Sequence, residues 1–175
     1  MPTSDAEQMA PDTISPEMIA SAAAGDAIAM NAMLDLLAPT VQRVCGPIAL
    51  DRGADATQEA LIAIFRNLSS LREPGALYGW AIRIATREAV RVAKAAATLT
   101  TWESFPEIPT RDPGELGVDI EDILTGLSPE HRAILVLRDL EGYSEQEAAA
   151  LLSIREGTAK SRLHRARSLF RKEWT

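Results

Sequence analysis

Apolar residues recur at intervals of three and four along most of the chain, which predicts α-helices rather than strands. The first helix is predicted to start at Ser15-Pro16-Glu17, because a serine N-cap, a first-turn proline and an acid favour a helix N-terminus. Helical periodicity continues through Ala38. Pro39 and Gly46-Pro47 then predict boundaries or kinks.

Two further helices are predicted over 55–68 and about 77–97. The pattern then dissolves over 98–118, where prolines, glycines and acids accumulate, and we interpret this stretch as an interdomain linker. Helical order resumes near residue 119, and Ser128-Pro129-Glu130 is a second helix-start sequence, for a helix that runs to about residue 140.

These elements predict an all-α fold class with two small helical domains joined by a flexible acidic linker. The predicted divisions are a disordered N-terminus (1–14), a first domain (15–97), the linker (98–118) and a second domain (119–175).

The second domain ends in a pattern typical of a helix-turn-helix. Ser144 and Glu147 fit the capping box S-x-x-E at the start of a short helix over 144–152. After a tight turn, a longer basic helix is predicted over 157–172. One narrow apolar stripe, made of Ala159, Leu163, Ala166 and Phe170, follows that helix.

The face opposite this stripe carries Ser161, His164, Arg165 and Ser168, with Arg162 to one side. Ser161, Arg162 and Arg165 lie one to two turns into the helix, where contacts to the major groove usually fall, and either arginine could pair with a guanine. The alternative is a solvated basic helix at the end of a bundle.

The distribution of charge along the chain, rather than the net charge, supports nucleic acid as a partner. The net charge of −7 argues against nucleic acid as a partner. Lysine and arginine nevertheless outnumber acids by six to two in 61–100 and by seven to two in 153–175. Cys45 is the single cysteine and lies in an apolar stretch, so we expect a buried thiol, no intrachain disulfide and a cytoplasmic protein.

Several strings of residues together resemble bacterial extracytoplasmic-function (ECF) sigma factors of the sigma-70 superfamily. In the C-terminal half they are Leu127-Ser128-Pro129-Glu130-His131-Arg132, Gly142-Tyr143-Ser144 and the run from Gly157 to Arg167, which resemble region 4. In the N-terminal half they are Asp55-Ala56-Thr57-Gln58-Glu59 and Tyr78-Gly79-Trp80-Ala81-Ile82-Arg83-Ile84-Ala85, which resemble region 2.

The resemblance implies a transcription initiation factor that binds core RNA polymerase through its clamp helices and flap, recognises −35 and −10 promoter elements and helps to open DNA. It implies polymerase binding by Asp55, Gln58 and Glu59. It implies −10 contacts by Arg72, Tyr78, Trp80, Arg83, Arg87, Arg91 and Lys94. The last four recur at i, i+4, i+8 and i+11, which predicts one basic stripe along the helix, suited to a phosphate backbone. The resemblance implies −35 contacts by Arg155, Glu156, Thr158, Lys160, Ser161, Arg162, His164 and Arg165. An anti-sigma protein is a further partner to consider, and no membrane insertion is expected.

The chain departs from the family pattern at several positions. Arg87 stands where asparagine is usual, Arg91 where aspartate is usual, Ala81 where leucine is usual, and Ser153 where glycine is usual after the first helix of the helix-turn-helix. The changes at 81, 87 and 91 put the −10 specificity in question.

Two other functions stay open at this point. A stand-alone helix-turn-helix regulator would use the same C-terminal helices without polymerase, but would have no use for the surface of Asp55, Gln58 and Glu59. An enzyme is the weakest alternative, because the sequence contains no glycine-rich phosphate loop, no metal-ligand cluster and no nucleophile triad. We therefore expect no catalytic residues, no metal and no cofactor.

Overall fold

The structure, a computed structural model, describes residues 13–103 and 120–174. The N-terminal unit contains α1 (Pro16–Ala23), α2 (Ala27–Ala49), α3 (Gly53–Asn67) and α4 (Leu77–Glu103), with short 3₁₀ turns η1 (Leu50–Arg52), η2 (Leu68–Ser70) and η3 (Pro74–Ala76). The C-terminal unit contains α5 (Ile120–Thr125), α6 (Pro129–Leu135), the π-turn η4 (Val136–Leu140), α7 (Glu145–Leu152) and α8 (Glu156–Trp174). These two ranges hold no strand, so the all-α prediction is confirmed.

The predicted helix starts carry the expected caps, and one break in the helical pattern was missed. The Ser15 hydroxyl accepts a hydrogen bond from the Met18 amide, and the Ser128 hydroxyl accepts one from the His131 amide. The missed break separates α1 from α2 at Gly25, whose φ of +100° favours glycine. Asp26 then caps α2 by accepting hydrogen bonds from two following amides.

The prolines of α2 do not end the helix. The helix continues through Pro39 and Pro47, although each proline removes one backbone hydrogen bond. The buried face of α2 compensates for that loss, because Leu37, Val41 and Val44 are fully buried along it. The two prolines therefore weaken the backbone hydrogen bonding of α2 locally, and tertiary packing keeps the helix continuous.

Small residues allow the helices of the N-terminal unit to approach one another closely. Ala81, Ala85 and Ala89 form the fully buried face of α4. At the start of α3, a Cβ on Gly53 would lie 3.0 Å from the Cα of Gly46 on α2. Cys45 is buried in this core as predicted, and burial raises the pKa of its thiol to about 12.

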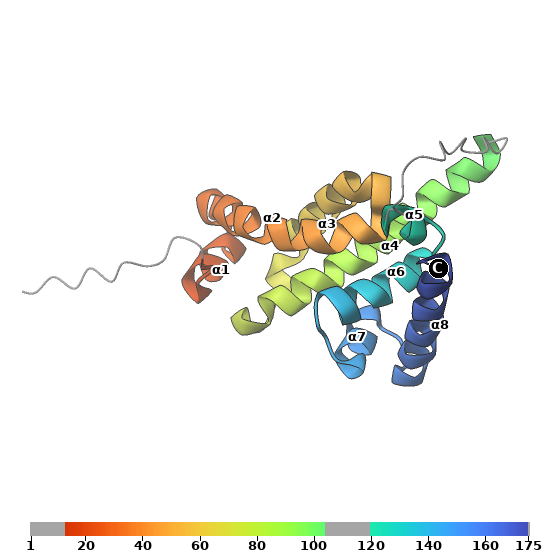
Figure 1. The fold of residues 1–175 in the computed structure, drawn as a ribbon. Helices are drawn as coiled ribbons and strands as arrows, with labels where there is room; N and C mark the ends of the chain where they lie inside the picture. The colour runs from red at the N-terminus through yellow and green to blue at the C-terminus, as the bar shows by residue number, and fades with distance from the viewer. Residues whose placement is uncertain (1–12, 104–119, 175) are drawn as a thin grey trace, which may run out of the picture.

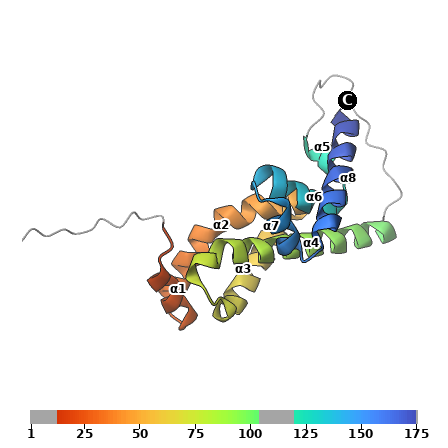
Figure 2. The ribbon, with the colours of Figure 1, turned by 90° about the horizontal axis from the view of Figure 1, so that it is seen from below.

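The two units pack against each other, which the sequence did not predict. In Figure 1, α4 lies between α2 and α3 on one side and α6, α7 and α8 on the other, and Figure 2 shows the same arrangement from below. The helix pairs α2–α6, α4–α6 and α4–α7 are in contact. α4 also continues through Glu103, beyond the predicted end at residue 97. The rest of the predicted linker, 104–118, and most of the predicted disordered N-terminus lie outside the described residues.

Arg132 on α6 is a buried cation that joins the units through hydrogen bonds to backbone carbonyls. Its side chain is nearly enclosed, at 6% exposed. Nε donates to the Ile48 carbonyl at 2.7 Å, and one terminal nitrogen donates to the carbonyls of Leu127 at 2.5 Å and Leu124 at 3.1 Å. Ile48 lies in the last turn of α2, so the guanidinium satisfies a carbonyl that the helix leaves unpaired. Burial lowers the pKa of Arg132, which shows that the position is costly for a charge.

We predict that Arg132→Met lowers the free energy of unfolding by roughly 2–3 kcal/mol, because methionine fills the space but leaves buried carbonyls without donors. Urea denaturation followed by circular dichroism measures this loss. Arg66→Met is the control, because Arg66 is exposed on α3 and its substitution should stay within about 0.5 kcal/mol. Equal stability of the two variants would contradict the proposed role of Arg132.

Candidate nucleic-acid interface and polymerase-facing surface

The C-terminal unit contains the helix-turn-helix that the sequence predicts. Both halves of the capping box form: the Ser144 hydroxyl accepts from the Glu147 amide at 3.2 Å, and the Glu147 carboxylate accepts from the Ser144 amide at 2.7 Å. These hydrogen bonds lower the pKa of Glu147, the backbone one most. After α7 the chain turns at Ser153, whose φ of +55° is left-handed and explains why glycine suits this position.

α8 presents a buried stripe and an exposed basic face. Ala159, Leu163 and Ala166 are buried against α6 and α7. Arg155 lies just before the helix. The predicted −35 residues are exposed except for Arg162, which is half-buried: they are Arg155, Glu156, Thr158, Lys160, Ser161, Arg162, His164 and Arg165. The structure therefore brings this set together on one helix.

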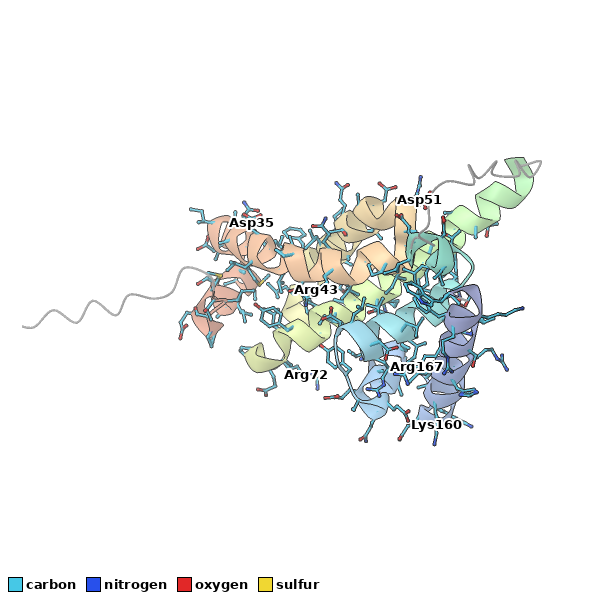
Figure 3. All side chains as sticks on the ribbon, in the orientation of Figure 1. Asp35, Arg43, Asp51, Arg72, Lys160 and Arg167 are labelled. Atoms are coloured by element: carbon cyan, nitrogen blue, oxygen red, sulfur yellow. The ribbon has the colours of Figure 1, made fainter. Side chains whose placement is uncertain are left out.

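One basic residue of α8 is used within the unit. Arg167 forms a bidentate ion pair with Asp139 of η4, with contacts of 2.5 and 3.2 Å. The hydrogen bond to Asp139 raises the pKa of Arg167. Figure 3 labels Lys160 and Arg167 on α8 and Arg72 near the start of α4. The pair orients η4 against α8 and leaves the residues on the opposite side of α8 exposed.

The predicted basic stripe of α4 divides into two groups. Arg83 and Lys94 reach the C-terminal unit, where Arg83 donates to the Ser153 hydroxyl at 3.1 Å and Lys94 forms an ion pair with Glu130. Arg87 is exposed, 3.9 Å from Glu88. Arg91 turns the other way, towards α3. The stripe that was predicted as one phosphate-facing surface is therefore divided between contacts to the C-terminal unit and ion pairs with Glu59 and Glu88.

Arg91 is part of the predicted polymerase-facing surface. It contacts Glu88 at 2.7 Å and Glu59 at 3.2 Å, and the hydrogen bond to Glu88 is the main cause of its raised pKa. The three residues predicted to bind polymerase, Asp55, Gln58 and Glu59, are all exposed on α3, and Asp55 pairs with Arg52 at 3.2 Å. With Arg52 and Arg91 they line a cavity of about 260 Å³. The acidic surface is thus partly neutralised by two arginines, which spacing along the sequence did not reveal.

The other predicted −10 residues lie around the start of α4. Arg72 is exposed between η2 and η3, and Tyr78 is 46% exposed in the first turn of α4. Trp80 is half-buried and packs against the core of the N-terminal unit. This placement leaves Tyr78 as the more accessible aromatic surface for stacking a base.

Sequence reasoning missed two apolar surfaces. Phe65, an aromatic side chain of α3, is 54% exposed. In the C-terminal unit, a groove of about 720 Å³ is lined by residues that include Leu124, Leu163 and Phe170, and it is flanked by exposed Ile120 and Leu140. The sequence did carry a signal for these surfaces, because the helices concerned contain more large apolar residues than one buried helix face needs.

The part of the chain that the structure describes contains neither a candidate metal site nor a helix that could span a membrane. No cluster of three or more histidine, cysteine or acidic side chains there is arranged to hold a metal ion. Among the described helices, none combines the length and the apolar character needed to cross a membrane.

A partly buried ion pair, together with the contacts of Arg83, Lys94 and Arg132, holds the units in this arrangement. Arg43 of α2, labelled in Figure 3, donates twice to Glu141, at 2.7 and 3.0 Å. The Glu141 side chain is only 7% exposed, and the hydrogen bond to it raises the pKa of Arg43. Bidentate pairing with a largely desolvated carboxylate is a stronger contact than an ordinary surface ion pair.

Comparison with known proteins matches both units to sigma-70 regions. The family model for Sigma-70 region 2 matches residues 33–98, and the model for Sigma-70, region 4 matches residues 117–169. The two matches fall on the N-terminal and C-terminal units, and together they define the class as a sigma-70 protein.

Individual relatives narrow the class. The chain is 36% identical to the ECF RNA polymerase sigma factor SigE of Mycolicibacterium smegmatis over 129 residues, which are 67% of this chain and 49% of that protein. It is 30% identical to the ECF RNA polymerase sigma-E factor of Escherichia coli K12 over 131 residues, 65% of this chain and 69% of that protein. The chain belongs to the ECF family of RNA polymerase sigma factors.

A solved structure shares the fold. The sigma factor RpoE from Bartonella quintana, in complex with the anti-sigma factor NepR, superposes with a TM-score of 0.62 at 23% identity, covering 81% of this chain and 93% of that chain. The chain spans about half the length of its M. smegmatis relative.

We predict that Glu141→Arg separates the two units, because it places a second cation against Arg43 at a largely buried position. Small-angle scattering of the free protein should show a larger radius of gyration for this variant. The double variant Arg43→Glu with Glu141→Arg restores the opposite charges and should return the compact value. Asp35→Arg, at an exposed site on α2, is the control. An unchanged radius for Glu141→Arg would show that this pair does not hold the units together.

Proposed function

We propose that this chain binds core RNA polymerase and directs it to specific promoters by recognising −35 and −10 elements and assisting promoter opening. The observation that carries the proposal is the presence, in one chain, of both sigma-70 regions, each with an exposed surface of the appropriate chemistry. α3 offers Asp55, Gln58 and Glu59 to polymerase. α8 offers a basic face to duplex DNA.

The division of work follows the two units. Region 2, proposed over 15–97, holds the clamp helices of polymerase and contacts the −10 element through residues at the start and along one side of α4. Region 4, proposed over 119–175, binds the −35 element through α8 and rests on the polymerase flap. Residues 98–118 are proposed as a linker from the sequence, and α4 extends through the first part of that segment.

The placement of Arg91 revises the proposed −10 contacts. Because Arg91 pairs with Glu59 and Glu88, we assign it to the polymerase-facing surface rather than to DNA. Arg83, Arg87 and Lys94 stay candidate contacts to the −10 element along α4. Arg72, Tyr78 and Trp80 stay candidate contacts at the start of α4 and in the loop before it. Arg83 and Lys94 have partners in the C-terminal unit, so they become available to DNA only when the two units separate.

Further partners and location follow from the same role. The structure of the sigma factor RpoE from Bartonella quintana was solved in complex with an anti-sigma factor. We propose that an anti-sigma protein is also a partner of this chain. We propose a cytoplasmic, non-catalytic protein, because its proposed partners, polymerase and the chromosome, are in the cytoplasm. The stand-alone regulator is less favoured, since it leaves the region 2 match without a purpose.

The direct test of the proposed function is transcription in vitro with core polymerase from the same bacterium and a library of its promoters. The chain should direct initiation at a discrete subset that shares −35 and −10 motifs. Initiation that does not depend on the added chain would contradict the proposal.

We predict that Asp55→Lys with Glu59→Lys reduces binding to core polymerase at least tenfold, because reversed charges on α3 would repel the surface that the acids attract. Co-purification with tagged core polymerase measures this. Asp35→Lys, an exposed acid on α2, should bind normally. Unchanged binding by the double variant would favour the stand-alone regulator.

We predict that Arg165→Ala weakens recognition of the −35 element by about 10- to 100-fold, the usual range for an arginine that contacts a base. Occupancy of a promoter from the selected set, with the variant bound to polymerase, measures the loss. Arg66→Ala, outside both proposed DNA surfaces, is the control. If both variants occupy the promoter as wild type does, α8 does not read the −35 element through Arg165.

A further inference from the structure

A small cavity lies where the two units meet. Its volume is about 200 Å³, and α4, α6, α7 and α8 all contribute to its wall. Arg83 and Arg87 of α4 line it from the N-terminal unit, and Arg162 of α8 lines it from the C-terminal unit. The packing of the two units therefore gathers three arginines around one small, partly open cavity.

The carboxylates around this cavity do not balance its positive charge. Glu130 is the single acid among the lining residues, and it already forms an ion pair with Lys94. Arg83 donates to a neutral hydroxyl, that of Ser153, and Arg87 lies 3.9 Å from the carboxylate of Glu88. Like charges that converge with only one carboxylate among the lining residues raise the free energy of the packed arrangement, unless an anion lies between them.

A second observation comes from Thr86, which lies between the two arginines of α4. Thr86 is 1% exposed, and its hydroxyl has no hydrogen-bond partner among the described residues. Thr86 is also one of the residues that line the cavity. Because a buried hydroxyl without a partner is costly, this position favours a ligand that accepts or donates a hydrogen bond there.

We propose that this cavity binds a small phosphate-bearing anion, such as inorganic phosphate or diphosphate. Tetrahedral phosphate oxygens accept charge-assisted hydrogen bonds, and arginine is well suited to donate them in pairs. Arg83, Arg87 and Arg162 supply the donors and the compensating charge, and the Thr86 hydroxyl supplies a further donor. A volume of about 200 Å³ admits such an anion but not a DNA duplex.

The anion would connect the two units. It contacts α4 on one side and α8 on the other, so binding stabilises the packed arrangement relative to the separated one. It also occupies Arg83, Arg87 and Arg162, which the proposed function assigns to promoter DNA. This regulatory consequence rests on the proposed function, whereas the binding of the anion does not.

The test uses inorganic diphosphate and the full chain, without polymerase, in magnesium-free buffer with ionic strength matched by sodium chloride. Calorimetric titration should show saturable binding at one site, and the melting temperature should rise with diphosphate concentration. Thr86→Val keeps the shape and removes the hydroxyl, so the variant should fold and bind about tenfold more weakly. Arg162→Ala should weaken binding at least as much, and Arg66→Ala should bind as wild type does. Absence of saturable binding, or binding as tight as that of the wild type by both Thr86→Val and Arg162→Ala, would overturn the proposal.

A second probe separates a free anion from the phosphates of DNA. A short duplex without promoter sequence is titrated onto the wild type and onto Thr86→Val. We expect the same duplex affinity for both proteins, because Thr86 is buried between the units. If Thr86→Val weakens duplex binding while diphosphate does not bind, the cavity is part of the DNA surface and the proposal fails. Promoter-directed transcription, measured separately, reports on the proposed function alone.

Discussion

The arrangement of this protein depends on the burial of one guanidinium group, that of Arg132. A cation removed from water is tolerated only when its donors are satisfied, and here they are satisfied by backbone carbonyls instead of a carboxylate. Ile48, one of these acceptors, lies in the last turn of α2, where carbonyls lack intrahelical partners and the helix dipole is negative. One side chain therefore completes the end of α2 in the N-terminal unit and the turn after α5 in the C-terminal unit. The ion pair of Arg43 with Glu141 adds a second fixed point between the same units.

α4 belongs to the N-terminal unit and also packs against helices of the C-terminal unit. This contact links the packing of the units to the proposed binding of DNA by α4. One face, with Ala81, Ala85 and Ala89, is buried, while Arg83 and Lys94 contact residues of α6 and the α7–α8 turn. A side chain that donates to Ser153 or Glu130 is not available to phosphate at the same time. The proposed recognition of two promoter elements by one chain therefore requires that the units exchange contacts with each other for contacts with DNA and polymerase. The contacts of Arg83 and Lys94 are polar and partly exposed, so each of these is weak enough to be replaced.

The sequence predicted the helices well because helix formation depends on local signals. The serines at 15, 128 and 144 cap helices as predicted, and Ala159, Leu163 and Ala166 of the apolar stripe of α8 are buried as predicted, while Phe170 is half-buried. Where tertiary packing overrides a local signal, the prediction of a helix boundary was wrong: α2 continues through Pro39 and Pro47. The packing of the units was not predicted, because no periodicity within one helix reveals which distant surface covers it. For the same reason Arg91 was assigned to a single basic stripe, although Glu59, 32 residues away in sequence, pairs with it. The predicted site residues on α3 and, except for half-buried Arg162, those on α8 are exposed as their proposed roles require.

The central claim is that the two units are packed together in the free protein and separate when the protein acts. Spin labels at Ile28→Cys on α2 and Ser168→Cys on α8 allow the distance between the units to be measured by electron spin resonance, and buried Cys45, with its raised pKa, should not be labelled. The account predicts one narrow distance distribution in the free protein and a longer distance after core polymerase and promoter DNA are added. A broad distribution in the free protein, or the same distance in both states, would contradict it.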